Sequence, residues 1–294
     1  MGKRVFLFLA TNLAIVIVMS VVFSLLGIGG YVGADGQLQL VPLAIFCLVW
    51  GMGGALISLQ MSRWIAKKAM GVKLVDGRSG NADLDWLHAT VSRQAERSGL
   101  PVPEIGYYES EEVNAFATGP SKRRSLVAVS TGLLRGMQRN EVEAVLAHEI
   151  GHIANGDMVT MTLIQGVLNA CVMFLARIVA FGVRQAMDSR LAGVVSFVVM
   201  IVLQIALGIL ASLVTAWFSR QREFRADAAA ANLAGRENMT AALRRLMTTT
   251  ARVDTSNAAL ATFKIAGGKS WLAAFSTHPP LEERIAALQS GRQV

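Results

Sequence analysis

Charged side chains are scarce in this chain. Lys, Arg, Asp and Glu make up 16% of its 294 residues, whereas an ordinary soluble domain contains about 25%. The shortfall lies in long apolar runs, and 53% of the chain is hydrophobic. This composition argues against an ordinary soluble protein and predicts an integral membrane protein that is mainly α-helical.

Cysteine is also rare. The chain has only Cys47 and Cys171, and both lie inside apolar runs, so we expect no disulfide framework. The net charge of +8 comes largely from basic residues that flank the apolar runs, as they do in membrane proteins. No basic stripe carries interleaved aromatic residues, so we expect a lipid bilayer and no nucleic acid as a partner.

Histidine occurs four times, and two of the four lie within five residues, in the sequence His148-Glu149-Ile150-Gly151-His152. On an α-helix, side chains four residues apart share a face, so both imidazoles can reach one metal ion. A hydrolytic zinc site keeps one position open for water, and Glu149 can accept a proton from that water. The alternative is an amphipathic helix with two surface histidines.

The boundaries of this helix can be predicted from its flanks. Asn140 is expected to cap the N-terminus, with Glu143 completing a capping box. Asn155-Gly156 is a natural stop signal. The sequence therefore predicts a helix over 140–155 that carries both histidines.

Four apolar runs are long enough to span a lipid bilayer: 5–26, 38–61, 159–181 and 191–218. Basic residues lie outside the first pair and none lies in the loop between them, which predicts a hairpin with the N-terminus in the cytoplasm. A cleaved signal peptide is the rival interpretation of the first run. The last two runs either span the membrane or form a hairpin that packs within the protein or only dips into the bilayer. The link between them holds Arg184, Asp188 and Arg190, which opposes the positive-inside rule if the link lies outside.

We therefore divide the chain into four parts. Residues 1–61 form an N-terminal transmembrane hairpin, and 158–218 form a second hydrophobic hairpin. Residues 62–157 form a cytoplasmic part in which β-prone segments at 105–108, 113–117 and 126–129 predict a small antiparallel sheet beside the helix with the two histidines. Residues 219–294 are a second cytoplasmic part with helices expected over 219–235, 238–253 and 281–289.

A third metal ligand is expected on a separate element. Glu223 and Asp227 are four residues apart on one predicted helical face, so one carboxylate can bind the metal and the other can accept the N–H of a ligating histidine. The rival interpretation is an ordinary charged face with Arg222 and Arg225 as partners. Because Glu223 follows the last apolar run by only a few residues, the metal is expected within about 10 Å of the membrane boundary, on the cytoplasmic side.

Several sequence segments together resemble a known family. They are V-N-A-F-A-T-G (113–119), H-E-I-G-H-I-A-N-G-D (148–157), S-R-Q-R-E-F-R-A-D (219–227) and T-H-P-P-L-E-E-R-I-A-A-L (277–288). With the N-terminal hydrophobic pair, they make the chain similar to the HtpX-type membrane zinc metalloproteases, bacterial relatives of the CaaX-prenyl-type endopeptidases. The resemblance covers nearly the whole chain and implies a zincin-like protease domain attached to the two hydrophobic hairpins.

The resemblance also implies roles for individual residues. It implies one Zn²⁺ per chain, held by His148, His152 and Glu223. It implies that Glu149 is the general base and that Asp227 is the carboxylate that orients a ligating histidine. The family role implied is quality control of membrane proteins under stress, in the bacterial cytoplasmic (inner) membrane, with misfolded or unfolded polypeptides as substrates.

The remaining implied residues lie around the reaction centre. The family places Asn114, Ala115 and Phe116 at a sheet edge that pairs with an extended substrate. It places His278 and Arg284 as catalytic supports, and His278 is a candidate for holding the oxyanion. Without the family, 114–116 can be a plain edge strand, and His278 can be a histidine held by local packing.

Two other functional classes stay open at this point. A non-proteolytic membrane scaffold with a structural zinc needs a closed four-ligand site and has no use for Glu149. A small-molecule amide hydrolase can use the same zinc site, although an edge strand favours peptides. The oligomeric state has no signature in the sequence.

Overall fold

The computed structural model describes residues 17, 18, 21, 30–187, 190–256 and 275–290. The first predicted apolar run, 5–26, lies almost entirely outside these residues. The chain divides into two compact units. The first is made of residues 1–60 and 160–215, and the second of residues 61–159 and 216–294. Each unit therefore joins two stretches that are far apart in the sequence.

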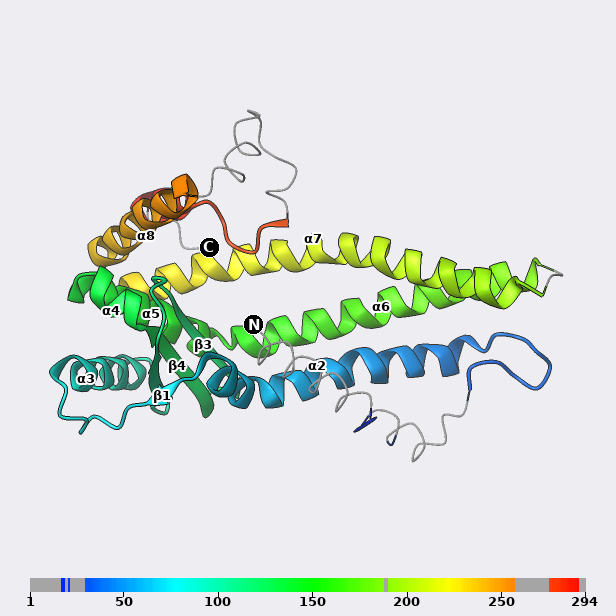
Figure 1. Cartoon of the computed structure of the whole chain (residues 1–294), viewed down its shortest axis with the longest axis horizontal. Helices are drawn as coiled ribbons and strands as arrows, with labels where there is room; N and C mark the ends of the chain where they lie inside the picture. Colours follow the sequence, from blue (N-terminus) through cyan, green and yellow to red (C-terminus); the bar gives the residue numbers. More distant parts are fainter. Residues whose placement is uncertain (1–16, 19–20, 22–29, 188–189, 257–274, 291–294) are drawn as a thin grey trace. The chain divides into compact units, whose positions relative to one another are not determined.

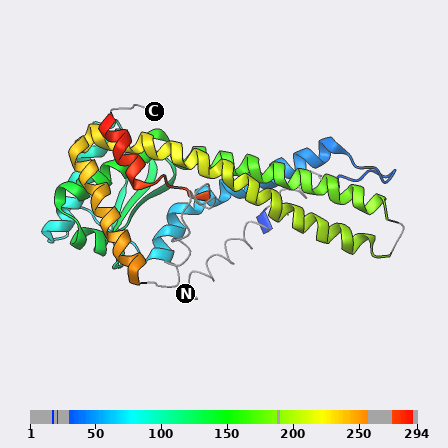
Figure 2. The same ribbon diagram turned by 90° about the horizontal axis from the view of Figure 1, so that it is seen from above.

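Three long helices build the first unit: α2 (Leu40–Met70), α6 (Asp157–Gln185) and α7 (Ala192–Ala234). Each also continues into the second unit (Figure 1). All three are long and apolar enough to cross a membrane, with mean hydropathies of 2.2, 2.0 and 2.8. Thr215 of α7 donates a hydrogen bond to Gln165 of α6, O···O 3.4 Å, and the two helices lie side by side (Figure 2). The second, third and fourth predicted runs are thus helical, whereas the number of membrane crossings stays a prediction.

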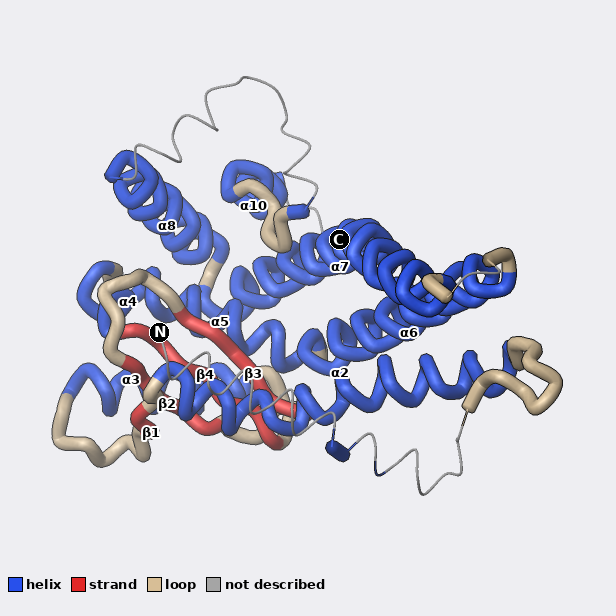
Figure 3. The backbone as a smooth tube through the Cα atoms, turned by 45° about the vertical axis from the view of Figure 1, so that its right-hand side comes forward, coloured by secondary structure: helices blue, strands red, loops and turns tan. Residues whose placement is uncertain are grey.

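A four-stranded sheet lies at the centre of the second unit (Figure 3). Its strands are β1 (Lys73–Leu74), β2 (Glu104–Tyr108), β3 (Ala115–Ser121) and β4 (Arg124–Ser130), in the order β1-β2-β4-β3. The predicted wholly antiparallel arrangement is wrong, because β2 and β4 are parallel. The other two pairs are antiparallel.

The connection between β2 and β3 explains the mixed sheet. Residues 109–114 carry the chain past one strand position, and β3 forms at the outer edge. The tight turn after Ser121 then returns β4 into the vacant place between β2 and β3. The chain reverses direction twice, once at 109–114 and once at this turn, so β4 runs parallel to β2 and leaves β3 as an edge strand.

The core of this unit covers one face of the sheet. The helices α3 (Ala82–Arg97) and α5 (Arg139–Asn155) contribute Leu87, Val91, Leu146 and Ile150, all fully buried against Val127 of β4. Asn81 caps α3 with its side chain. Burial of this kind contributes about 1.5–3 kcal/mol for each large aliphatic side chain, so the core fixes α5 against the sheet.

The C-terminal helices complete the same core. They are α8 (Arg236–Ser256) and α10 (Leu281–Ser290), and they contribute Met239, Leu243 and Leu288. Their bounds lie within a few residues of the predicted helices at 238–253 and 281–289. The short helix α4 (Thr131–Gly136) joins β4 to α5. The second unit thus brings α5, the end of α7 and α10 around one site.

Candidate active site

The helix α5 carries both histidines, as predicted, but it starts earlier than expected. Gln138 is the N-cap, and it forms the capping box with Glu141. The prediction that Asn140 caps the helix is wrong, because Gln138 already has extended backbone angles and Arg139 is already helical. Gly156 ends the helix in the left-handed conformation with φ 71°, which glycine adopts at little cost.

The two imidazoles lie together in the interior. His148 and His152 are 8% and 7% exposed, and their ring centroids are 4.6 Å apart. Four-residue spacing puts them on one face, and the core packing of α5 turns that face toward α7. Gly151 permits a close approach of the two helices, since a methyl group there would lie 3.0 Å from the Cβ of Ala229 and 3.2 Å from the backbone oxygen of Ala226.

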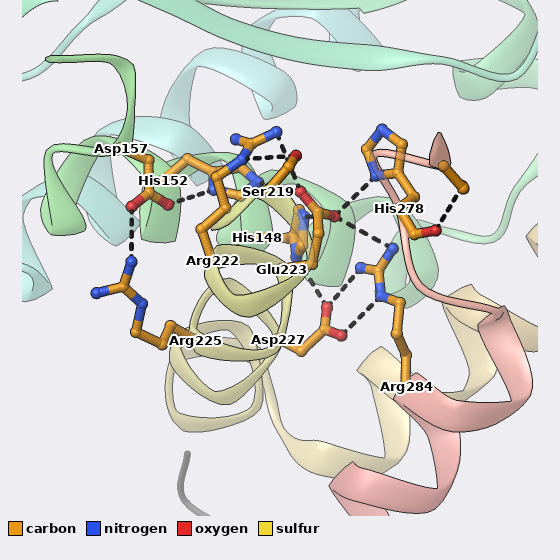
Figure 4. A network of polar contacts seen from close by, with 11 residues as sticks. His148, His152, Asp157, Ser219, Arg222, Glu223, Arg225, Asp227, His278 and Arg284 are labelled. Carbon is orange, nitrogen blue, oxygen red and sulfur yellow. Dashed lines mark hydrogen bonds and ion pairs between the residues drawn. The ribbon is translucent and has the colours of Figure 1, made fainter. Parts of the chain in front are cut away.

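Glu223 reaches this pair from α7. Its Oε2 lies 3.5 Å from Nε2 of His148, and its Oε1 lies 3.4 Å from Nε2 of His152 (Figure 4). One potential ligand atom from each of the three residues lies within 4.8 Å of the others. Oε1 is buried, and its neighbours, Nε2 of His152 and a guanidinium nitrogen of Arg222, make only long contacts to it at 3.4 Å. Two imidazoles and one carboxylate with an unsatisfied oxygen fit a divalent metal, and this donor set suits zinc.

A second carboxylate lies behind each histidine. Oδ1 of Asp227 is 2.9 Å from Nδ1 of His148, and Oδ2 of Asp157 is 2.7 Å from Nδ1 of His152. Both acids are buried. A carboxylate on Nδ1 fixes the tautomer and leaves Nε2 as the free ligand atom. The structure therefore turns both Nε2 atoms toward Glu223.

Asp157 is a site residue that the sequence reasoning missed. It is the first residue of α6, directly after the left-handed Gly156. The glycine reverses the chain so that Asp157 points back to His152, five residues earlier (Figure 4). Its sequence signature is an acidic residue directly after the glycine that ends the helix with the two histidines. Arg225 lies 3.6 Å from the other oxygen of Asp157.

The C-terminal segment supplies the remaining polar groups. Arg284 of α10 donates to both oxygens of Asp227, at 2.8 and 2.6 Å, and its third nitrogen is 3.4 Å from Glu223. His278 lies just before α10, with Nδ1 3.1 Å from Oε2 of Glu223. His278 is largely exposed, whereas Arg284 is buried. Arg222 does lie 3.4 Å from Glu223, but the burial of Glu223 and Asp227 argues against the rival interpretation of an ordinary charged face on α7.

Electrostatics keep the carboxylates ionised. Burial would raise the pKa of Glu223, but hydrogen bonds to His148, His152 and His278 hold that pKa far below its usual range. Burial likewise opposes ionisation of Asp227, and hydrogen bonds to Arg284 and His148 lower its pKa nonetheless. The site therefore presents negative charge that a cation can neutralise.

The pKa values of the two histidines are raised instead. Burial would lower the pKa of His148, but hydrogen bonds to Asp227 and Glu223 raise it above the usual value. Burial also acts against protonation of His152, while hydrogen bonds to Asp157 and Glu223 raise its pKa to about 9. Metal ions and protons compete for the same ligand atoms, so a bound metal displaces these protons.

A cavity of about 220 Å³ opens beside the cluster. Its polar wall consists of His148, Glu149, Glu223, His278 and Arg284. Its apolar wall consists of Val113, Leu133, Val145, Met239, Leu243 and Leu246. The half-buried Glu149 therefore lies between the metal-ligand cluster and a space that takes an apolar group.

The predicted substrate strand borders this cavity. Ala115 begins the edge strand β3, and Asn114 precedes it; both line the cavity. The backbone of Asn114 bonds to Ser130 in both directions, so Asn114 faces β4. Backbone groups alternate along an antiparallel strand, which turns those of Ala115 away from β4. The third predicted residue, Phe116, packs its ring on Tyr108 instead.

Comparison with known proteins confirms the resemblance. The model of Peptidase family M48 matches residues 81–292. The chain is 50% identical over 292 residues to Protease HtpX of Idiomarina loihiensis, covering 99% of this chain and 100% of the relative. It is 49% identical over 297 residues to the Protease HtpX homolog of Bacillus licheniformis, with coverages of 99% and 100%.

A solved structure shares the fold. The crystal structure of S. mikatae Ste24p aligns with a TM-score of 0.66 at 19% identity, covering 97% of this chain. This chain spans 64% of the length of that protein. The match to a peptidase family, the His-His-Glu cluster and three helices apolar enough for a bilayer lead to one conclusion: the chain belongs to peptidase family M48 and is a membrane metalloprotease.

Proposed function

We propose that this protein is a zinc-dependent endopeptidase of the bacterial inner membrane. It cleaves misfolded or damaged membrane proteins at the cytoplasmic face. The observation that carries the proposal is the position of Glu149, which lines one cavity together with the metal-ligand cluster and the start of an edge strand. The quality-control role rests on the similarity to proteases named HtpX.

His148, His152 and Glu223 would hold one zinc ion, since their ligand atoms converge within 4.8 Å. When bound, zinc polarises the scissile carbonyl and makes water more acidic. Asp227 and Asp157 hold the two imidazoles with Nε2 toward the cluster. Arg284 holds Asp227 with two hydrogen bonds, so it is a positioning residue and needs no contact with substrate.

Glu149 is placed to act as general base and then as general acid. Its carboxylate accepts a proton from the attacking water and returns a proton to the leaving amine, which typically contributes about 10²–10⁴-fold to the rate. His278 is exposed at the cavity and hydrogen-bonds to Glu223 through Nδ1. Because Nδ1 donates to Glu223, Nε2 can donate to the oxygen that becomes negative when the carbonyl is attacked only while the ring carries both protons.

The substrate chain pairs with the outer edge of β3. The N–H and C=O of Ala115 point away from β4, so an extended peptide can add to the sheet there. The peptide then passes Glu149, and an apolar side chain enters the space lined by Leu133, Val145 and Leu243. Apolar side chains are abundant in membrane proteins and become accessible when these proteins misfold, which fits the proposed substrate class.

Replacement of Glu149 tests the proposed activity. We expect Glu149→Gln to keep its zinc, measured by atomic emission after dialysis, and to lose cleavage of an unfolded membrane-protein substrate. Glu143→Gln is the matched control, because Glu143 lies on the same helix and pairs with Arg93 away from the cavity. Wild-type turnover by Glu149→Gln would remove Glu149 from the mechanism.

Replacement of Ala115 tests the substrate strand. Ala115→Pro removes an N–H that β4 does not use, so the sheet should persist while proteolysis falls. Ala115→Ser keeps the N–H and serves as control. Zinc content should be unchanged in both variants, and normal cleavage by Ala115→Pro would place the peptide elsewhere.

Cysteine labelling tests the orientation. In a background without Cys47 and Cys171, a cysteine at position 35 should react with an impermeant reagent applied to intact cells. A cysteine at position 79 should react only after lysis. The reverse pattern would place the active site outside the cytoplasm.

A further inference from the structure

Two arginines line a cavity in the first unit that the protease chemistry does not use. The cavity measures about 540 Å³, and its polar wall includes Arg177 and Arg184 of α6, Ser196 of α7, and Tyr31. Its apolar wall includes Ala180, Phe181, Phe197 and Met200. Gln185 of α6 donates a hydrogen bond to the backbone oxygen of Gly36, N···O 3.3 Å, so the loop before α2 meets the end of α6 here.

The contacts of Arg177 leave its charge without a counter-ion. Its guanidinium lies 5.2 Å from the centroid of the Phe46 ring, and one nitrogen donates to the backbone oxygen of Met173 at 3.3 Å. Its Nε is buried and has no acceptor among the described residues. In that part of the chain no carboxylate lies within 4.0 Å of Arg177 or Arg184.

A charged arginine within an apolar helix costs free energy unless it has a partner. Arginines within membrane helices are rare and face the protein interior or a polar cavity, where they bind a partner. Arg177 lies eight residues before the end of α6, which is roughly 12 Å along the helix. In the structure its guanidinium bonds to Met173, which lies farther from that end, so the side chain would turn toward the end of α6 to meet a headgroup. Among the described residues these arginines have no anionic partner, which leaves the cavity open to an anion from outside the chain.

We propose that this cavity binds the phosphodiester headgroup of an anionic lipid. Arg177 and Arg184 bind the phosphate oxygens, because the guanidinium fork matches phosphate in geometry and charge. Tyr31 lines the same cavity, and a phenol can donate a further hydrogen bond. The apolar wall formed by Phe181, Phe197 and Met200 accommodates an acyl chain, which a free phosphate ion does not possess.

The proposal also accounts for the charge of the link between α6 and α7. Arginines at this end oppose the positive-inside rule in the proposed orientation. The acidic residue of this link, Asp188, lies outside the described residues, and among those described a lipid phosphate would supply the negative charge that Arg177 and Arg184 lack. The site would therefore stabilise the first unit without taking part in proteolysis.

Native mass spectrometry of the full-length protein in mild detergent tests this site. The protein is titrated with phosphatidylglycerol, with phosphatidylcholine and, separately, with inorganic phosphate. We expect retention of phosphatidylglycerol in preference to phosphatidylcholine, and no competition from millimolar phosphate. Arg177→Gln and Arg184→Gln should each weaken retention about tenfold, since each removes a charge-assisted contact.

Arg190→Gln is the matched control, because Arg190 carries the same charge near the same end of α6 but does not line the cavity. An equal loss in all three variants would show a general effect of surface charge and would overturn the proposal. Equal retention of the two lipids, or displacement by phosphate, would overturn it as well. If Arg177→Gln fails to fold, the exposed Arg184 still provides the test, and Arg177→Lys should retain lipid at an intermediate level.

Discussion

The two units treat buried charge in opposite ways. In the second unit, the buried carboxylates of Glu223, Asp227 and Asp157 outnumber the buried Arg284 when both histidines are neutral, and this excess negative charge suits a metal ion. In the first unit, Arg177 and Arg184 lie at a cavity without a carboxylate among the described residues, and the excess positive charge suits an anion. The sign of the unpaired charge therefore indicates what each unit must take from outside the chain.

The largest effect should come from removal of charge at the metal. Glu223→Gln keeps the shape of the side chain but takes away the carboxylate that faces both histidines. Zinc content should fall below detection after dialysis, and cleavage should fall by more than the roughly 10–100-fold typical of an outer partner. Glu282→Gln, on the exposed side of α10, is the control. A Glu223→Gln protein that stays loaded would show that the third ligand lies elsewhere.

The second-largest effect should be a loss of folding stability when Arg284 is replaced. Arg284→Gln leaves Asp227 and Glu223 buried with one cation fewer, which should cost about 3–5 kcal/mol in the metal-free protein. Bound zinc supplies positive charge, so the loss should be smaller in the loaded protein. Thermal unfolding with and without zinc measures the difference. An equal loss in both forms would mean that Arg284 acts through packing alone.

The third effect concerns the orientation of the two histidines. Asp157→Asn and Asp227→Asn should each reduce zinc affinity or activity by about 10–100-fold, because each removes the charged partner of one Nδ1. Competition with a fluorescent chelator gives the affinities. If Asp157→Asn binds zinc as tightly as the wild type, then only His148 depends on an outer carboxylate.

The smallest effect should come from the uncharged polar groups of the first unit. Gln165 donates to Asn169 at 2.8 Å and accepts from Thr215, but interhelical hydrogen bonds in membranes average only about 0.6 kcal/mol. Gln165→Leu should therefore change stability by less than about 1 kcal/mol and leave cleavage intact. A loss as large as that of Arg284→Gln would remove the contrast between the units.

The parts of the site that depend on local geometry were predictable. The spacing of His148 and His152 and that of Glu223 and Asp227 each follow from one turn of a helix, and the structure brings the two pairs together. Asp157 was missed because its approach to His152 depends on a chain reversal at Gly156. The predicted antiparallel direction of β4 was wrong. Strand order depends on contacts between distant segments, which periodicity along the chain does not encode.

The missing side chain of Gly151 has a consequence for metal choice. The helices that carry the histidines and Glu223 are as close as they are because nothing stands between Gly151 and the pair Ala226 and Ala229. A methyl group at position 151 would push them apart by a few tenths of an ångström. Zinc forms short bonds to imidazole and carboxylate, whereas larger ions form longer ones. We therefore expect Gly151→Ala to shift the metal preference of the site toward ions of larger radius. The absence of a side chain at position 151 then contributes to the choice of metal by ionic size.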